Sequence, residues 1–166
     1  MRAFIVFAAT TMTCGLSLAD EAWTVDKSTD KIDRSAVVVA VRSASEGAFR
    51  GTAASFALVL RCKGREVDAI LRTDEFLGQA RRGAPATLRI GETVTKTTVH
   101  GAQDYKAIFF SEADAHRIVA AAIAKQEIAV RAEIMGATLE ALVTPADDVS
   151  GPQAVLDECK AKPKRQ

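Results

Sequence analysis

Residues 56–72 read FALVLRCKGREVDAILR, and this stretch decides the fold. In its first half Leu58, Leu60 and Cys62 are spaced two residues apart, which is typical of a strand with one buried face. Lys63-Gly64 then interrupts the pattern with a tight turn, after which apolar residues resume. The stretch predicts two antiparallel strands, residues 56–62 and 66–72, joined as a hairpin.

Similar short segments follow on both sides of this hairpin, separated by turn residues. Gly91-Glu92 and Gly136 predict two further hairpin turns. Residues 46–51 and 145–151 are predicted as loops, and residues 74–82 as a helical turn ended by Gly83 and Pro85. The other predicted strands are residues 36–42, 86–90, 93–99, 107–110, 127–134 and 138–143.

Two helices are predicted late in the chain. Ser111 is placed to cap the first, whose first turn carries Glu112 and Asp114. The second begins near Ser150 and runs to about Lys160. One buried stripe in the first helix consists of Ala115, Ile118, Val119, Ala122 and Ile123. We therefore expect an α+β fold, in which an antiparallel β-sheet or sandwich is flanked by two helices.

The first residues have the pattern of a secretory signal peptide. Arg2 precedes an apolar run, and Ser17 and Ala19 occupy the −3 and −1 positions of a cleavage site before Asp20. We expect a signal peptide at residues 1–19, a single domain at 20–160 and a disordered basic tail at 161–166. The expected location is periplasmic or secreted.

Two alternatives remain for this leader, a membrane anchor and a lipoprotein. The apolar run is short for a hydrocarbon core of about 30 Å, which disfavours an anchor. Lipidation at Cys14 is disfavoured because Thr11 and Thr13 stand where lipoprotein processing prefers Leu and Gly or Ala. We expect no stable membrane insertion of the mature form.

The cysteines and charges fit an exported domain. Three cysteines become two when Cys14 leaves with the signal peptide, so Cys62 and Cys159 are expected to form one disulfide. A thiol nucleophile or metal ligand is disfavoured, because the chain contains no CxxC pair and has no histidine near either cysteine. With 22 basic and 21 acidic residues, the composition gives no general attraction to nucleic acid.

Motifs for catalysis are scarce. The two histidines, His100 and His116, form no metal-binding pair, and no Gly-x-Ser-x-Gly elbow or glycine-rich phosphate loop occurs. Asp147-Asp148 is more typical of a turn and helix entry than of a catalytic pair. We therefore expect a non-enzyme with no catalytic residues, no metal site and no cofactor.

Arginines are the candidate binding residues. Strand alternation predicts that Arg61 points away from buried Leu58, Leu60 and Cys62, and Arg89 away from Leu88 and Ile90. By the same rule Arg42 is expected outside with Val37, Val39 and Val41 inside, and Arg131 is expected opposite Ile128, Val130 and Ala132. We expect Arg42, Arg61, Arg89 and Arg131 on one polar face that binds a partner, with Arg72 as a fifth member. The alternative is that these arginines solvate the face or pair with Asp30, Asp33, Asp68 and Glu133.

The order of these features resembles the VasI/TagO-like family of small exported proteins associated with type VI secretion. The resemblance rests on Trp23-Thr24-Val25, on Leu60-Arg61-Cys62 at the end of an apolar strand, on Leu88-Arg89-Ile90-Gly91, and on a final helix ending in Cys159. It covers nearly the whole mature chain. It implies a non-enzymatic envelope accessory protein and the same Cys62–Cys159 bridge.

Two functional hypotheses follow. The first is an exported accessory or adaptor protein that binds a protein partner in the cell envelope. The alternative is a secreted inhibitor of a cell-wall or host enzyme. An uncharacterised hydrolase is a third and weaker hypothesis.

Overall fold

The computed structural model of the chain describes residues 22–32, 34–78 and 83–161. These described residues form an 11-stranded sheet, two helices and one disulfide. The strands are β1 (Thr24–Thr29), β2 (Ala36–Ser43), β3 (Glu46–Phe49), β4 (Thr52–Ala53), β5 (Phe56–Lys63), β6 (Glu66–Thr73), β7 (Ala84–Ile90), β8 (Thr93–Gly101), β9 (Ala107–Phe109), β10 (Ile128–Ile134) and β11 (Ala137–Val143), and the helices are α1 (Glu112–Ile123) and α2 (Ser150–Lys160). The predicted α+β class with an antiparallel sheet and two helices is confirmed.

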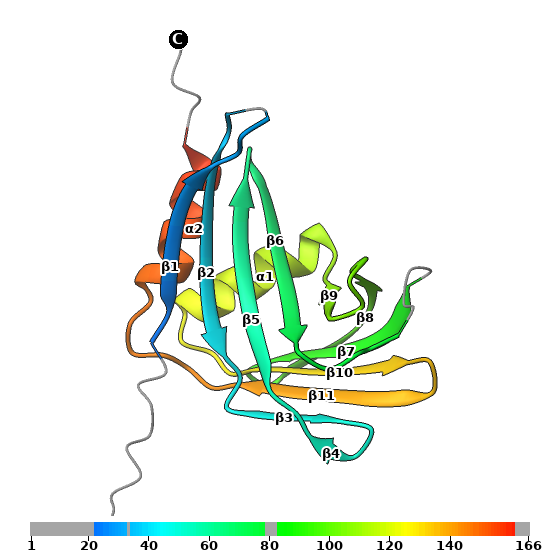
Figure 1. Cartoon of the computed structure of the whole chain (residues 1–166). Helices are drawn as coiled ribbons and strands as arrows, with labels where there is room; N and C mark the ends of the chain where they lie inside the picture. Colours follow the sequence, from blue (N-terminus) through cyan, green and yellow to red (C-terminus); the bar gives the residue numbers. More distant parts are fainter. Residues whose placement is uncertain (1–21, 33, 79–82, 162–166) are drawn as a thin grey trace, which may run out of the picture.

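The sheet has two halves that run in different directions. Its strand order is β1-β2-β5-β6-β9-β8-β7-β10-β11-β3-β4. The strands β1, β2, β5 and β6 of the first half stand upright in Figure 1, whereas β7, β10 and β11 of the second half run across the view. Both helices lie behind the upright strands, so one face of the first half is packed and the other carries no helix.

The hairpin at residues 56–72 lies at the centre of the first half. β5 pairs with β6 from Phe56↔Thr73 to Lys63↔Glu66, as predicted. Leu58, Leu60 and Cys62 are buried against the helices, together with Leu71 of β6. Alternating apolar side chains thus form the face on which α1 and α2 pack.

The start of α1 is fixed to the second half of the sheet. The Ser111 side chain accepts a hydrogen bond from the Asp114 backbone N–H, so the predicted cap is confirmed. The buried Asp114 carboxylate accepts hydrogen bonds from Thr97 of β8 and from Arg117, and Arg117 also donates to Thr95. This network joins the start of α1 to β8, and in it the buried Asp114 carboxylate has hydrogen-bond donors for both of its oxygens.

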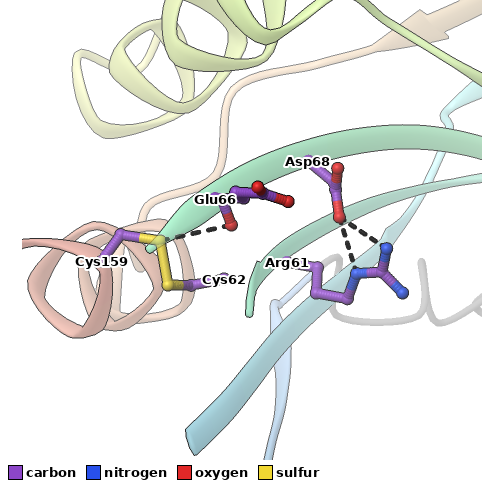
Figure 2. The surroundings of a disulfide bond; sticks show 5 residues. All are labelled: Arg61, Cys62, Glu66, Asp68 and Cys159. Atoms are coloured by element: carbon purple, nitrogen blue, oxygen red, sulfur yellow. Dashed lines mark hydrogen bonds and ion pairs between the residues drawn. A yellow bond between two sulfur atoms is a disulfide. The ribbon is translucent and has the colours of Figure 1, made fainter. Parts of the chain in front are cut away.

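The predicted disulfide is present. Cys62 of β5 and Cys159 of α2 are bonded with their Cα atoms 5.6 Å apart (Figure 2). The Cys159 Sγ also lies 3.4 Å from the Glu66 carbonyl oxygen. Because a disulfide sulfur carries no proton, this is a packing contact. The bridge ties the last helix to the central hairpin.

A strand, β3, replaces most of the loop predicted at residues 46–51, and a turn at residues 50–51 joins it to β4. β3 begins at Glu46 and pairs with β11, and β4 returns along β3. Glycine at position 47 had indicated a loop, but its role is close packing, because a Cβ there would overlap the Ala54 carbonyl and the Phe56 ring. β1 was also not predicted, because all its side chains are exposed and it lacks an apolar alternation.

Three other predictions have different outcomes. Residues 74–75 form a bend and residues 76–78 have no regular structure, so the predicted helical turn is wrong there, and residues 79–82 lie outside the described residues. Also outside them are the predicted signal peptide, its cleavage site before Asp20 and residues 162–166 of the predicted tail. In the part of the chain that is described, no helix is sufficiently long and apolar to cross a membrane.

Ser150 does not cap α2 as predicted. Val149 occupies the cap position and makes no side-chain cap, whereas the Asp148 carboxylate accepts hydrogen bonds from the Ser150 backbone N–H (2.8 Å) and hydroxyl (2.9 Å). These two bonds hold the pKa of Asp148 below its ordinary value of 3.8.

We expect Ser150→Ala to raise the pKa of Asp148 towards that value, because it removes the hydroxyl donor and keeps the backbone donor. Since folding lowers this pKa, the contribution of Asp148 to stability is complete above about pH 3.8 and is lost as pH falls through the folded pKa. A carboxyl-detected NMR titration measures the shift, with exposed Asp104 as an internal control. An unchanged Asp148 pKa in the variant would contradict this assignment.

Candidate functional site

The structure places three of the four candidate arginines at the surface. The side chains of Arg61, Arg89 and Arg131 are 35%, 39% and 67% exposed. Arg72, the fifth member, is also exposed, and its strand neighbours Val67, Ala69 and Leu71 are buried as expected. Arg42 is only 3% exposed, so the prediction that it points outward is wrong.

Arg42 is buried because β2 is apolar on both faces. Val38 and Ala40 form the packed face, where α2 approaches so closely that a Cβ on Gly151 would lie 3.2 Å from the Ala40 Cβ. Arg42 follows two residues after Ala40 and therefore lies on the same face. Its guanidinium donates to the Pro145 carbonyl oxygen at 3.2 Å, which makes it a structural residue.

The surface arginines do not share one face. Arg61 lies on the first half of the sheet, whereas Arg89 on β7 and Arg131 on β10 lie on the second. Each forms an ion pair: Arg61 with Asp68 at 2.5 Å, Arg89 with Glu127 at 2.6 Å and Arg131 with Glu140 at 2.7 Å. Ion pairing, the expected alternative, is therefore observed, but only Asp68 is one of the expected partners, because Arg89 pairs with Glu127 and Arg131 pairs with Glu140.

Arg89 and Arg131 line a groove of about 480 Å³ on the second half of the sheet. This outer groove is the candidate functional site, and it is formed by residues Glu46, Gly47, Ala48, Thr87, Arg89, Val94, Ala129, Val130, Arg131, Glu140, Ala141 and Leu142. Five strands contribute to it, from β8 through β7, β10 and β11 to β3.

Strand register explains its shape. One row of side chains runs across the strands as Val94, Arg89, Ala129, Leu142 and Glu46. The next row is Lys96, Thr87, Arg131, Glu140 and Ala48. The small side chain of Ala129 in the middle of the first row forms a low floor, and Arg89, Leu142 and Arg131 are its longer neighbours.

The outer groove combines apolar contact with displaceable charges. Val94 is 61% exposed and stands beside Arg89, and Leu142 flanks Ala129 on the other side. The Arg131–Glu140 pair is largely exposed, so it contributes only about 0–1 kcal/mol. A carboxylate on a partner can therefore replace Glu140 beside Arg131 at small cost.

Groups for catalysis do not gather in this groove. Both histidines are exposed, and neither His100 nor His116 is among the groove residues. Within residues 22–32, 34–78 and 83–161, no three His, Cys, Asp or Glu side chains are placed to hold a metal ion.

No protein-family model, curated protein or solved structure matches this chain. The groove must therefore be interpreted from its own residues.

Sequence reasoning found only part of this site. Alternation on β7 and β10 correctly placed Arg89 and Arg131 outside. The contributions of Val94, Leu142 and Glu46 were missed, because they depend on which strands are neighbours. One signal was available: Ala129 is a small residue on the polar side of β10, where a longer side chain would fill the groove.

Proposed function

We propose that this chain is a non-enzymatic exported accessory protein that binds a protein partner of the cell envelope in the outer groove. The observation that supports this most is the groove, where exposed apolar side chains lie beside two arginines on a face without helices. Arginine with a neighbouring apolar residue is a common centre of protein interfaces. The proposed ligand is an extended segment that places an apolar side chain over Ala129 and a carboxylate beside Arg131.

Two further observations are consistent with this proposal. The Cys62–Cys159 disulfide fits an oxidising compartment. The resemblance to exported proteins associated with type VI secretion favours a partner from a secretion machine. A secreted inhibitor would use the same surface on an enzyme, and the identity of the captured partner distinguishes the two functions.

We expect replacement of both Arg89 and Arg131 by alanine to weaken partner binding by more than about tenfold, because both guanidinium groups border the groove. The stability should change little, because both arginines form partly exposed ion pairs and Arg89 adds one hydrogen bond to the Gly91 carbonyl oxygen. Arg72→Ala is the matched control, since Arg72 is exposed on the first half of the sheet.

The measurement has two steps. Crosslinking of the native mature chain in periplasmic extract, followed by mass spectrometry, identifies a partner, and titration with the purified partner then gives the dissociation constant. Equal affinities of the native chain and the double variant would contradict binding in the groove. A second variant, Ala129→Trp, fills the floor of the groove and should also abolish binding, whereas Ala120→Trp on the exposed side of α1 should not.

A further inference from the structure

The helix-free face of the first half of the sheet carries an apolar surface that the monomer leaves open. We call it the valine face, and it consists of Val37, Val39, Val41, Val59 and Phe109 together with Ile70, which lies among them and is itself only 8% exposed. The four valines are only half-buried, whereas Val38, Ala40 and Leu60 on the opposite face are at most 2% exposed. Figure 1 shows both helices on the far side of these strands.

The sequence of β2 fits a strand that is covered on both sides. An antiparallel strand with one solvated face normally alternates apolar and polar residues. In β2, residues 36–42 read AVVVAVR, so the helix-free side presents Val37, Val39 and Val41. A row of four apolar side chains continues from Val41 across the sheet to Val59, Ile70 and Phe109.

On one side of this row the charges are arranged by strand, whereas Arg72 of β6 lies on the other side of the row, opposite Ala57. β5 contributes the cations Arg61 and Lys63, and β6 contributes the anions Asp68 and Glu66. The register places Arg61 opposite Asp68 and Lys63 opposite Glu66. Opposite charges on the two strands leave this part of the face without a net charge that would attract a strongly acidic or basic partner.

This arrangement makes the face complementary to itself. Consider a second copy placed face to face, related by a two-fold axis that runs parallel to the strands between β5 and β6. Each side chain on β5 then faces the second copy of its own register partner on β6. Arg61 therefore faces a second Asp68, and Val59 faces a second Ile70.

The match extends to the neighbouring strands. The same axis places Val41 of β2 over Phe109 of β9 in the second copy, since both flank the Val59–Ile70 pair in register. Apolar side chains thus meet apolar ones, and cations meet anions. A two-fold interface requires this kind of self-complementary patch.

We propose that two copies of this chain dimerise through the valine face. The sheets pack face to face in an aligned orientation, with the helices of each copy on the outside. The outer groove lies on the other half of the sheet, so this inference does not rest on the proposed function.

Sedimentation velocity of the purified, oxidised mature chain from low micromolar to millimolar concentration tests the proposal. The native chain should dimerise reversibly, and Val59→Lys should weaken dimerisation by at least about tenfold, because it places a charge against Ile70 of the second copy. Met135→Lys is the matched control, since Met135 is 73% exposed between β10 and β11 and belongs to neither surface, and it should behave as the native chain. A native chain that remains monomeric throughout, or equal effects of the two variants, would overturn the proposal.

Charge reversal provides a second test at exposed positions that the fold tolerates. Arg61→Asp makes both members of the pair acidic, and Asp68→Arg makes both basic, so each variant alone should dimerise at least about tenfold more weakly than the native chain. Mixing the two variants should restore association as a heterodimer, since the acidic side chain introduced at position 61 of one copy then faces the basic side chain introduced at position 68 of the other. If the mixture associates no better than the separate variants, the proposed axis is wrong.

Discussion

Replacing Cys62 and Cys159 together by alanine should lower the free energy of unfolding by about 2–5 kcal/mol. The two residues are separated by 97 positions, so their bond closes most of the folded chain into one loop. In the chain-entropy model, a loop of about 100 residues stabilises the folded state by about 4.7 kcal/mol through restriction of the unfolded chain.

The folded state also explains why the effect should be large. Cys62 is 1% exposed near the end of β5, and α2 packs across β2 and β5 with Val155 fully buried. Without the bond, α2 is held to the sheet only by side-chain packing near the end of the chain. We expect α2 to detach more readily than the hairpin it covers.

Urea unfolding of the mature chain with and without reductant measures this contribution. Reductant should lower the stability of the native chain to nearly that of the double alanine variant and should leave the variant unchanged. Equal stability of the oxidised native chain and the variant would show that the bond does not stabilise the fold.

The sequence predicted the parts of the fold that depend on local alternation. In residues 56–72 the large side chains Phe56, Leu58 and Leu60 of β5 are two residues apart and share one buried face with Cys62. The start of α1 was also predicted from local sequence, since Ser111 stands at the position where its side chain accepts a hydrogen bond from the free backbone N–H of Asp114.

What could not be predicted depends on contacts between distant segments. β2 has apolar residues on both faces, so alternation alone could not choose which face lies inside. The choice is made more than a hundred residues later, where α2 packs on β2 and Pro145, in the segment before α2, accepts a hydrogen bond from the buried Arg42. The outer groove could not be predicted for a similar reason. The register that places Val94 and Leu142 near Arg89 depends on which strands are neighbours, and no single segment of the sequence determines it.

The approach of α2 to the sheet depends on Gly151. A Cβ at this position would lie 2.6 Å from the Trp23 Cβ and 3.0 Å from its Cγ, as well as close to Ala40. The Trp23 Cβ and the Ala40 Cβ are attached directly to the backbone, and the Trp23 indole is buried. None of these groups can move without shifting β2 or the segment before β1. Overpacking of this kind costs typically about 1–3 kcal/mol.

We therefore expect Gly151→Ala to destabilise the protein by about 1–3 kcal/mol, although alanine is the better helix former by about 1 kcal/mol. Ala154→Gly, one turn later in α2, is the matched control and should also destabilise the protein, because there helix propensity and packing both favour alanine. Urea unfolding of the oxidised chains measures both effects. A Gly151→Ala variant as stable as the native chain would mean that α2 sits farther from Trp23 and Ala40 than described, and the burial of Arg42 would then need another cause.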